Sequence, residues 1–266
     1  MALASVLLTL AQGTKAEQTD TGVSAPAHVE TIDLGLSVLW ASCNLGAESP
    51  ERYGDYYAWG EVAPRGYYAW QTYKYANNST FKLTKYCTYK NYGDNGFTDN
   101  KTVLEPEDDA AMVNWGEEWR MPTHAEWTEL REQCTWIWTT QNDVNGYRVT
   151  SKINRNSIFL PAAGYRGGEY LRDDGSIGYY WSSSLYDNSQ RAWYVYFRSD
   201  LVIGSDRDRT SGHSIRPVRA DKTGTGITTP QQDDASATGV RKVLRNGQVL
   251  IERNGKTYTL TGVEMK

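Results

Sequence analysis

The segment Gly178–Arg219 concentrates the residues whose types and spacing could do chemistry. It begins with the aromatic run Tyr179-Tyr180-Trp181 and ends with Ile215-Arg216-Pro217-Val218. Between these runs, polar and aromatic residues alternate with apolar ones, and two loops consist almost entirely of Asp, Arg, Ser, Asn and Gly. Tyrosine supplies contact area at a low entropic cost, and the polar residues supply adaptable hydrogen bonds. We therefore predict a scaffold that displays a ligand-binding face.

A simpler interpretation of the same segment stays open. Asp206-Arg207-Asp208-Arg209 could be a solvated loop whose charges pair with one another, and exposed pairs of this kind contribute little energy. The abundance of aromatic residues has two interpretations as well. The chain holds 10 Trp and 19 Tyr but 4 Phe, which suits half-buried packing in a loop-rich domain as well as a recognition surface.

Outside this segment, few residues form a pattern typical of a metal or catalytic site. Asp108-Asp109-Ala110-Ala111 predicts the first turn of a short helix, because acidic residues there complement the helix dipole. Metal coordination by the two carboxylates is a weaker alternative, and no metal site is predicted. His124 stands alone and is expected at the surface. No Ser-His-Asp pattern, glycine-rich phosphate loop or distinctively spaced carboxylate pair points to an enzyme.

The cysteines and the charge exclude further classes of function. Cys43, Cys87 and Cys134 form no Cys-x-x-Cys or Cys/His cluster, so a zinc site is not expected. An oxidising compartment would permit one disulfide among them, and the sequence does not choose the pair. The net charge of −4 and a pI of about 5.5 do not favour a nucleic-acid partner, because phosphate binding requires a basic face.

Short elements separated by long loops must position the binding face. Apolar residues at period two predict a strand from Ile32 to Trp40, and residues 50–96 predict long loops. These loops should be pinned by Tyr56, Tyr57, Trp59, Tyr68 and Trp70. Residues 147–153 and 157–160 predict a hairpin. In Ala192–Phe197, one face carries Trp193, Val195 and Phe197, and the opposite face, with Tyr194, Tyr196 and Arg198, is expected to be the wetter one.

The clearest helix signal begins at Thr123. Thr123-His124-Ala125-Glu126 fits a capping box, in which the Thr hydroxyl and the Glu carboxylate each accept a hydrogen bond from a free backbone amide. Trp127, Leu130 and Cys134 follow at helical spacing and predict one apolar face.

The two ends of the chain differ in composition from its middle. Residues 1–16 contain the apolar run ALASVLLTLA, which is too short to span a membrane and resembles part of a secretory signal peptide. Residues 17–30 and 220–239 are polar and predict linkers around a domain at 31–219. In residues 240–266, Asn246-Gly247 and Asn254-Gly255 separate apolar runs and predict a small β meander.

Several motifs occur in an order that resembles a known family. They are Asp33–Val38, Tyr53–Glu61, Asp108–Ala111, Trp119–Thr123 with Glu126-Trp127, Leu160–Gly164, Tyr180–Ser183 and Ser214–Arg219. Together they resemble the Fibrobacter succinogenes major paralogous domain family, which is related to formylglycine-generating enzymes and to the variable proteins of diversity-generating retroelements. The resemblance covers about residues 31–219. It implies an α+β, C-type-lectin-like fold with few helices, short antiparallel strands and long loops.

The resemblance also implies which residues contact a ligand. In the retroelement relatives, the binding residues lie between the two anchor motifs, which correspond here to Trp181 and Pro217. Carried over to this chain, the recognition segment is Tyr186 to His213. Its ligand-binding residues are Tyr186, Asp187, Asn188, Arg191, Tyr194, Tyr196, Arg198, Asp200, Asp206, Arg207, Asp208 and Arg209.

Catalysis and calcium binding fit the resemblance less well. The formylglycine-generating relatives need a reactive cysteine pair late in the domain, and this chain has no cysteine after Cys134. The calcium-dependent lectin motif has its nearest match in Glu105-Pro106-Glu107, which lies in a different context. Aromatic stacking is then the better way to bind a sugar.

We therefore expect a non-enzymatic binding module without a cofactor, with an unknown protein or glycan ligand outside the cell. A surface structural protein and an inactive enzyme relative are the alternatives. The tail, residues 240–266, is similar to type IX secretion sorting domains, which implies a secreted or outer-surface protein.

Overall fold

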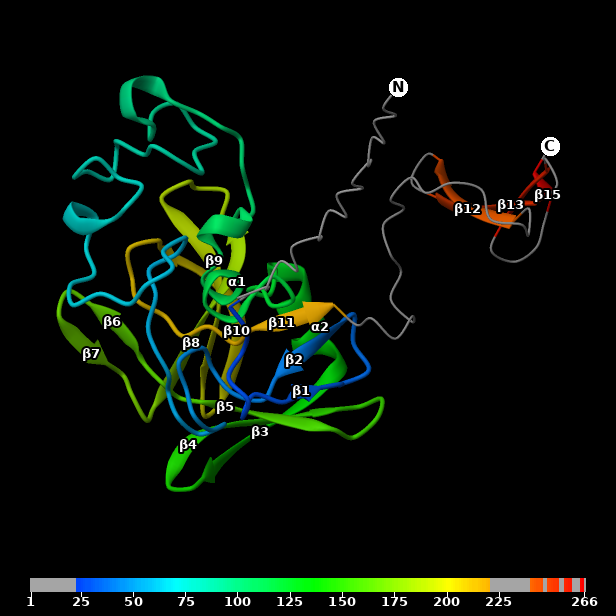
Figure 1. Ribbon diagram of the computed structural model, residues 1–266, viewed down its shortest axis with the longest axis horizontal. Helices are drawn as coiled ribbons and strands as arrows, with labels where there is room; N and C mark the ends of the chain where they lie inside the picture. The colour runs from blue at the N-terminus through cyan, green and yellow to red at the C-terminus, as the bar shows by residue number, and fades with distance from the viewer. Residues whose placement is uncertain (1–22, 221–239, 246–247, 254–255, 260–263, 266) are drawn as a thin grey trace, which may run out of the picture. The chain divides into compact units, whose positions relative to one another are not determined.

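The computed structural model describes residues 23–220, 240–245, 248–253, 256–259 and 264–265 (Figure 1). The chain divides into two compact units, residues 1–226 and 227–266. The predicted signal-like segment 1–16, residues 17–22 of the first predicted linker and residues 221–239 of the second lie outside the described residues. Among the described residues, no helix is long and apolar enough to cross a membrane.

The first unit is an α+β assembly of small antiparallel sheets with two helices, as predicted. Its elements are β1 (Thr31–Ile32), β2 (Val38–Ala41), η1 (Trp70–Thr72), η2 (Asp94–Gly96), η3 (Pro106–Asp108), α1 (Ala110–Trp115), α2 (His124–Gln133), β3 (Cys134–Gln141), β4 (Val144–Ser151), β5 (Ser157–Pro161), β6 (Tyr165–Gly167), β7 (Tyr170–Arg172), β8 (Ile177–Leu185), β9 (Arg191–Arg198), β10 (Leu201–Asp208) and β11 (Val218–Ala220).

The sheet β10-β9-β8 lies between two hydrophobic cores. Val195 and Phe197 of β9 pack into a core formed with α2, β2 and the sheet β3-β4-β5. Tyr194 and, in part, Tyr196 pack on the other side, into a core formed by α1 and the long loops. The prediction of one wet face on β9 is therefore wrong for Tyr194, which is 6% exposed, because the loops cover that face as well.

Helix α2 begins where the capping box predicts. Thr123 accepts a hydrogen bond from the backbone amide of Glu126, and the Glu126 carboxylate accepts one from the amide of Thr123. Trp127 and Leu130 are buried, as predicted from their spacing. Cys134 is buried too, but as the first residue of β3 rather than on the helix. Strand β3 pairs with β4, and β4 pairs with β5 in the predicted hairpin.

The predicted strand over residues 32–40 is divided into β1 and β2. Gly35 adopts φ +69, and its amide donates to Asp33 Oδ1, so the chain turns in the middle of the apolar alternation. The two short strands then pair with each other.

Long loops connect β2 to α1, as predicted, and the regular elements that the structure describes there are η1, η2 and η3. Figure 1 shows much of this connection in cyan and blue-green at the upper left of the first unit. Tyr56, Tyr57, Trp59 and Tyr68 are buried and anchor the loops, and Trp70 is half-buried. The polar groups of Tyr56, Trp59 and Tyr68 are hydrogen-bonded: Trp59 Nε1 donates to Ser182 O at 2.9 Å, for example.

The three cysteines are free thiols in the interior. Cys43, Cys87 and Cys134 are each buried. Burial raises the pKa of the Cys134 thiol to about 11, so this thiol stays protonated and unreactive at neutral pH.

The second unit contains a four-stranded antiparallel sheet. Its strands are β12 (Val240–Arg245), β13 (Gln248–Arg253), β14 (Lys256–Thr259) and β15 (Glu264–Met265), in that order. The predicted meander is thus present, with the short β15 as an additional strand.

Candidate ligand-binding face

The twelve residues predicted to bind a ligand do not lie on one surface. Strand β10 pairs with β9 so that Ser205 lies opposite Tyr194 and Asp206 lies opposite Trp193. Side chains alternate between the two faces of a sheet, so predicted residues that are neighbours in the sequence lie on opposite sides of the sheet β10-β9-β8. Tyr194, Tyr196, Arg198 and Arg207 share one side, and Arg191, Asp206 and Asp208 share the other. Tyr186, Asp187 and Asn188 lie in the turn before β9, and Asp200 lies in the turn before β10.

The first side carries a connected group that we call the tyrosine–arginine face, formed by Tyr165, Tyr179, Tyr196 and Arg207. The guanidinium carbon of Arg207 lies 4.1 Å from the ring centroid of Tyr165 and 5.5 Å from that of Tyr179. The Tyr179 ring lies 4.8 Å from Tyr165 and 5.4 Å from Tyr196. Tyr165, Tyr196 and Arg207 are half-buried, whereas Tyr179 is buried below them. These contacts hold the tyrosine rings in place and keep the Arg207 guanidinium at the surface.

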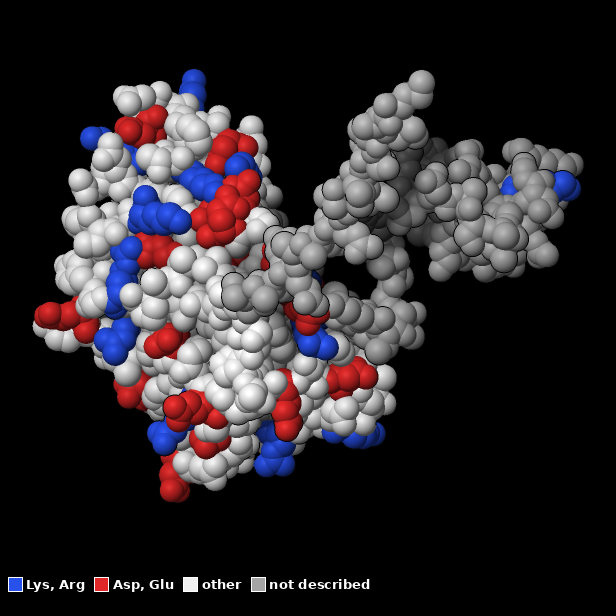
Figure 2. Space-filling view, viewed as in Figure 1, with Lys and Arg blue, Asp and Glu red and all other residues white. Residues whose placement is uncertain are grey.

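The β6–β7 hairpin extends this face. Tyr165 and Arg172 lie opposite each other in the hairpin, and Arg172 lies 5.8 Å from the ring of the exposed Tyr170. Figure 2 shows basic side chains in a column near the left edge of the view, beside the hairpin and the loops above it.

Below the face lies a packed aromatic layer. His213 is fully buried and stacks on Trp181 at a centroid distance of 3.9 Å. Its ring lies 5.0 Å from Tyr194 and 5.4 Å from Tyr179. Trp181 Nε1 donates to Tyr57 O at 2.8 Å, which ties the layer to the long loop. Burial, together with the nearby Arg207 charge, holds the pKa of His213 well below its usual range, so its ring is neutral at neutral pH.

On the opposite side of the sheet, the charged residues pair with one another. Arg191 forms an ion pair with Asp206, and its Nε lies 3.7 Å from Asp208 Oδ1. For Arg191, Asp206 and Asp208, pairing of the charges with one another therefore describes the structure better than a role in ligand recognition. Trp193 stacks on His124 at 3.9 Å and meets Tyr186 at 4.8 Å. His124 is therefore half-buried against Trp193 rather than free at the surface.

Arg209 belongs to the interior rather than to any binding face. Its side chain is fully buried beside Trp59, with the guanidinium carbon 5.0 Å from the ring centroid. Its Nε donates to Tyr73 Oη, and its Nη1 donates to the carbonyl oxygens of Tyr86 and Ser189. The prediction that Arg209 binds a ligand does not fit this full burial. Alternation in the sequence cannot distinguish an exposed arginine from one that fixes a loop.

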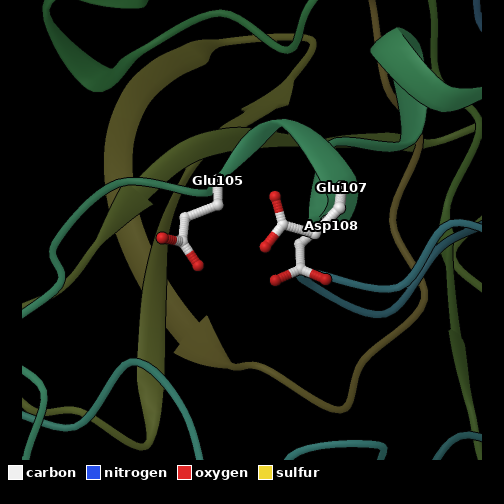
Figure 3. A group of neighbouring side chains, drawn as sticks. All are labelled: Glu105, Glu107 and Asp108. Atoms are coloured by element: carbon white, nitrogen blue, oxygen red, sulfur yellow. The ribbon is translucent and has the colours of Figure 1, made fainter.

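A group of carboxylates around Asp108 has the spacing of a metal site. One oxygen each of Glu105, Glu107 and Asp108 lie within 4.8 Å of one another (Figure 3). The Lys85 ammonium already bridges them, at 2.5 Å from Glu105 and Asp108 and 3.1 Å from Glu107. Lys85 thus supplies the positive charge that a cation would otherwise bring.

Asp108 is also hydrogen-bonded to phenols of the long loop. It accepts from Tyr75 and, at 2.7 Å, from Tyr86, and it pairs with Lys74 at 3.0 Å. Burial raises its pKa, but the hydrogen bonds from Lys85, Tyr75, Tyr86 and Lys74 together lower it to about 2. This network fixes the long loop to η3. The neighbouring Asp109 caps α1, as the dipole argument predicts, by accepting from the amides of Ala111 and Met112.

Comparison with known proteins gives one match. A family model described as Domain of unknown function (DUF8237) matches residues 133–218. No curated protein and no solved structure matches the chain. The matched segment includes β6, β8, β9 and β10, and therefore all four residues of the tyrosine–arginine face.

Two contributors to this face escaped the sequence prediction, and a third residue, His213, has a different role from the predicted one. Tyr165 and Arg172 lie in a stretch with adjacent Gly-Gly and Asp-Gly turn signals, which obscured the β6–β7 hairpin. The buried His213 was predicted as one end of the recognition segment and proved to be its support. The sequence signal that could have identified Tyr165 is the position of this aromatic residue, directly after the tightly packed turn Leu160-Pro161-Ala162-Ala163-Gly164.

Proposed function

We propose that residues 23–220 form a C-type-lectin-like binding module that uses the tyrosine–arginine face to hold a ligand outside the cell. The supporting observation is that the rings of Tyr165, Tyr179 and Tyr196 and the guanidinium of Arg207 form one connected group. The sheet that carries most of this group lies between two hydrophobic cores. Rigid tyrosine rings bind with little loss of conformational entropy, and the tyrosine hydroxyls and Arg207 can form directional hydrogen bonds. None of the groups described on this face forms a nucleophile–base pair, which favours binding over catalysis.

The set of proposed ligand contacts differs from the set that the sequence predicted. Tyr196 and Arg207 remain proposed contacts, with Tyr165 and Arg172 added from the β6–β7 hairpin. Tyr194 and Arg209 are assigned to the scaffold, and Arg191, Asp206 and Asp208 form a self-paired group on the far side of the sheet.

An array of glycans and extracellular proteins, probed with wild type and Tyr196→Ala, tests this function. Removing the half-exposed ring should weaken binding at least tenfold, because a stacking surface is lost. Arg191→Gln, on the opposite side of the same sheet, is the matched control and should bind as the wild type does. Unchanged binding in both Tyr196→Ala and Arg207→Gln would exclude the face.

The export of the module is part of the proposal. A signal-peptide-like N-terminus and a tail similar to sorting domains support a secreted or outer-surface location, where such a face could meet its ligand. The tail similarity rests on the β meander pattern and on its position after a polar linker.

A further inference from the structure

Arg207 differs in its charge environment from the other arginines of the β9–β10 hairpin. Arg191 is paired with Asp206 and Asp208, and Arg198 Nε lies 2.8 Å from Asp200 Oδ1. Among the described residues, no carboxylate lies within ion-pair distance of Arg207. Its recorded partners are neutral: Nε lies 3.4 Å from Ser211 Oγ, and the Tyr194 hydroxyl also bonds to the side chain. Two such partners leave most of the five guanidinium donors available.

The surroundings of Arg207 strengthen any bond to an anion. The guanidinium lies on the Tyr165 ring at 4.1 Å and is half-buried, so part of its hydration is replaced by aromatic surface. Charge-assisted hydrogen bonds gain strength where water is partly excluded. A flat guanidinium fixed by stacking also loses little freedom on binding a carboxylate through two parallel bonds.

A second, independent observation lies directly below. His213 is fully buried, and neither of its ring nitrogens has a hydrogen-bond partner among the described residues. Leaving a buried donor and acceptor unpaired is costly, and buried polar groups in native structures are nearly always paired, so these nitrogens point to a water or another molecule that the chain does not supply. The ring lies 6.2 Å from Tyr165 and 5.4 Å from Tyr179, the two rings that carry Arg207.

The groups at the edge of the face limit how acidic the ligand can be. Glu169 and Asp173 are exposed on or beside the β6–β7 hairpin, and Asp173 accepts a hydrogen bond from Tyr179 Oη at 2.8 Å. These carboxylates would repel a densely acidic peptide. A sugar chain with isolated carboxylates avoids this repulsion, and its rings offer apolar C–H faces to tyrosine and hydroxyl edges to the polar rim.

We propose that the ligand is a glycan bearing isolated carboxylate groups, such as an oligosaccharide in which uronic-acid units are separated by neutral sugars, with one carboxylate seated on Arg207. The Tyr196 and Tyr165 rings stack against the neighbouring sugar units. This inference rests on the proposed function, because it names the ligand class of the same face.

The test uses a panel of uronic-acid oligosaccharides and their carboxyl-reduced counterparts, which share backbone and linkage and differ in charge. Binding to the full chain is measured by calorimetry, with an acidic polyglutamate peptide as a further probe. Wild type should bind at least one uronic-acid member. Carboxyl reduction and Arg207→Gln should each weaken that binding at least tenfold, and the variant should bind both forms of the sugar equally.

Two further variants separate charge from position. Arg207→Lys keeps the charge but loses the flat paired donors, so its affinity should fall between those of wild type and Arg207→Gln. Arg191→Gln removes an arginine from the opposite side of the sheet and should bind within about twofold of wild type, since an exposed, self-paired charge contributes little.

Three results would overturn the inference. They are equal affinity for the acidic and reduced sugars, Arg207-dependent binding of polyglutamate instead of the sugars, and no binding to any uronic-acid member. In each case, the glycan and protein array separates the two proposals. Tyr196-dependent binding of a neutral glycan or a protein there would preserve the binding module and reject the carboxylated ligand.

Discussion

At the residue scale, three arginines of one segment have two different environments. Arg209 and Arg216 are fully buried, and their guanidinium groups donate to oxygen atoms of distant loops. Arg207 is half-buried on two tyrosine rings without a carboxylate partner among the described residues. The first two therefore stabilise the fold, whereas Arg207 is available to a ligand.

Replacing Arg209 and Arg207 separately should distinguish these roles. Arg209→Met leaves the buried carbonyl oxygens of Tyr86, Ser189 and Lys85 without their donor and should lower the free energy of unfolding by about 3–5 kcal/mol. Arg207→Gln should cost less than about 1 kcal/mol. Urea unfolding followed by tryptophan fluorescence measures both values, and similar losses in the two variants would contradict the assignment.

The Asp108 network should produce an acid-dependent part of the stability. The pKa of Asp108 is about 2 in the folded protein, below its ordinary value of 3.8, so its contribution is present above pH 4 and is lost as the pH falls towards 2. This contribution should be about 2 kcal/mol. Asp108→Asn should flatten the unfolding free energy over that interval relative to wild type. A parallel loss of stability in both proteins would assign the effect to other carboxylates.

At the element scale, the hairpins and α2 depend on a few local requirements. Thr123 and Glu126 cap α2 reciprocally, and Trp127 Nε1 donates to Trp181 O at 3.1 Å, which ties the helix to β8. On β8, Gly178 lies opposite Phe197, whose ring fills the space that a side chain would need. The face therefore depends on both the correct start of α2 and the close approach of β8 to β9.

Gly178→Ala should be strongly destabilising. An added Cβ would lie 2.0 Å from Phe197 Cζ, so the ring must leave its place in the core, at a cost of about 1–3 kcal/mol. Gly66→Ala is the matched control, since nothing lies within 4 Å of its added Cβ. Thermal unfolding monitored by circular dichroism should separate the two variants, and equal midpoints would show that Phe197 adjusts freely.

Loss of the N-cap should be moderate. Thr123→Ala removes the hydroxyl that accepts from the Glu126 amide and should cost about 1 kcal/mol, while Thr123→Ser keeps it and should cost little. Chemical denaturation of both variants provides the comparison. A loss in the Ser variant as large as in the Ala variant would assign the effect to the Thr methyl group instead.

At the scale of the whole molecule, the chain divides into two compact units. The first contains both cores and the proposed binding face, and the second contains a four-stranded sheet. The family match, residues 133–218, falls within the first unit. A binding unit followed by a small unit similar to a sorting domain is consistent with the export that we propose.

Removing residues 240–266 should therefore change location rather than binding. The truncated protein should stay in the periplasm, and the thermal midpoint of the first unit should shift by no more than about 2 °C, because that unit has its own cores. Cell fractionation and calorimetry measure the two effects. Surface display of the truncated protein would remove the sorting role, and a large fall in the midpoint would show that the units depend on each other.

The sequence by itself determined the features that depend on neighbouring residues. The capping box at Thr123 located α2, alternation located β4, β5 and β9, and composition indicated the long loops between β2 and α1. These signals suffice because caps, turns and strand alternation are set by residues a few positions apart. The same local signals could not show that Cys134 leaves the helix for β3, or that Gly35 divides the first strand.

Only the tertiary structure decided which side chains of the Tyr186–His213 segment reach solvent. Tyr194 and Arg209 look as polar and as exposed in the sequence as Tyr196 and Arg207. Arg209 is nevertheless enclosed by residues of the long loops, and the Tyr194 ring packs on Tyr179, Trp181 and His213, whereas Tyr196 and Arg207 stay half-buried. Exposure depends on what packs against each side chain, and for Arg209 much of that is chain more than 100 positions away. For the same reason, pairing across β9 and β10 neutralises Arg191, whereas Arg207 meets tyrosine rings.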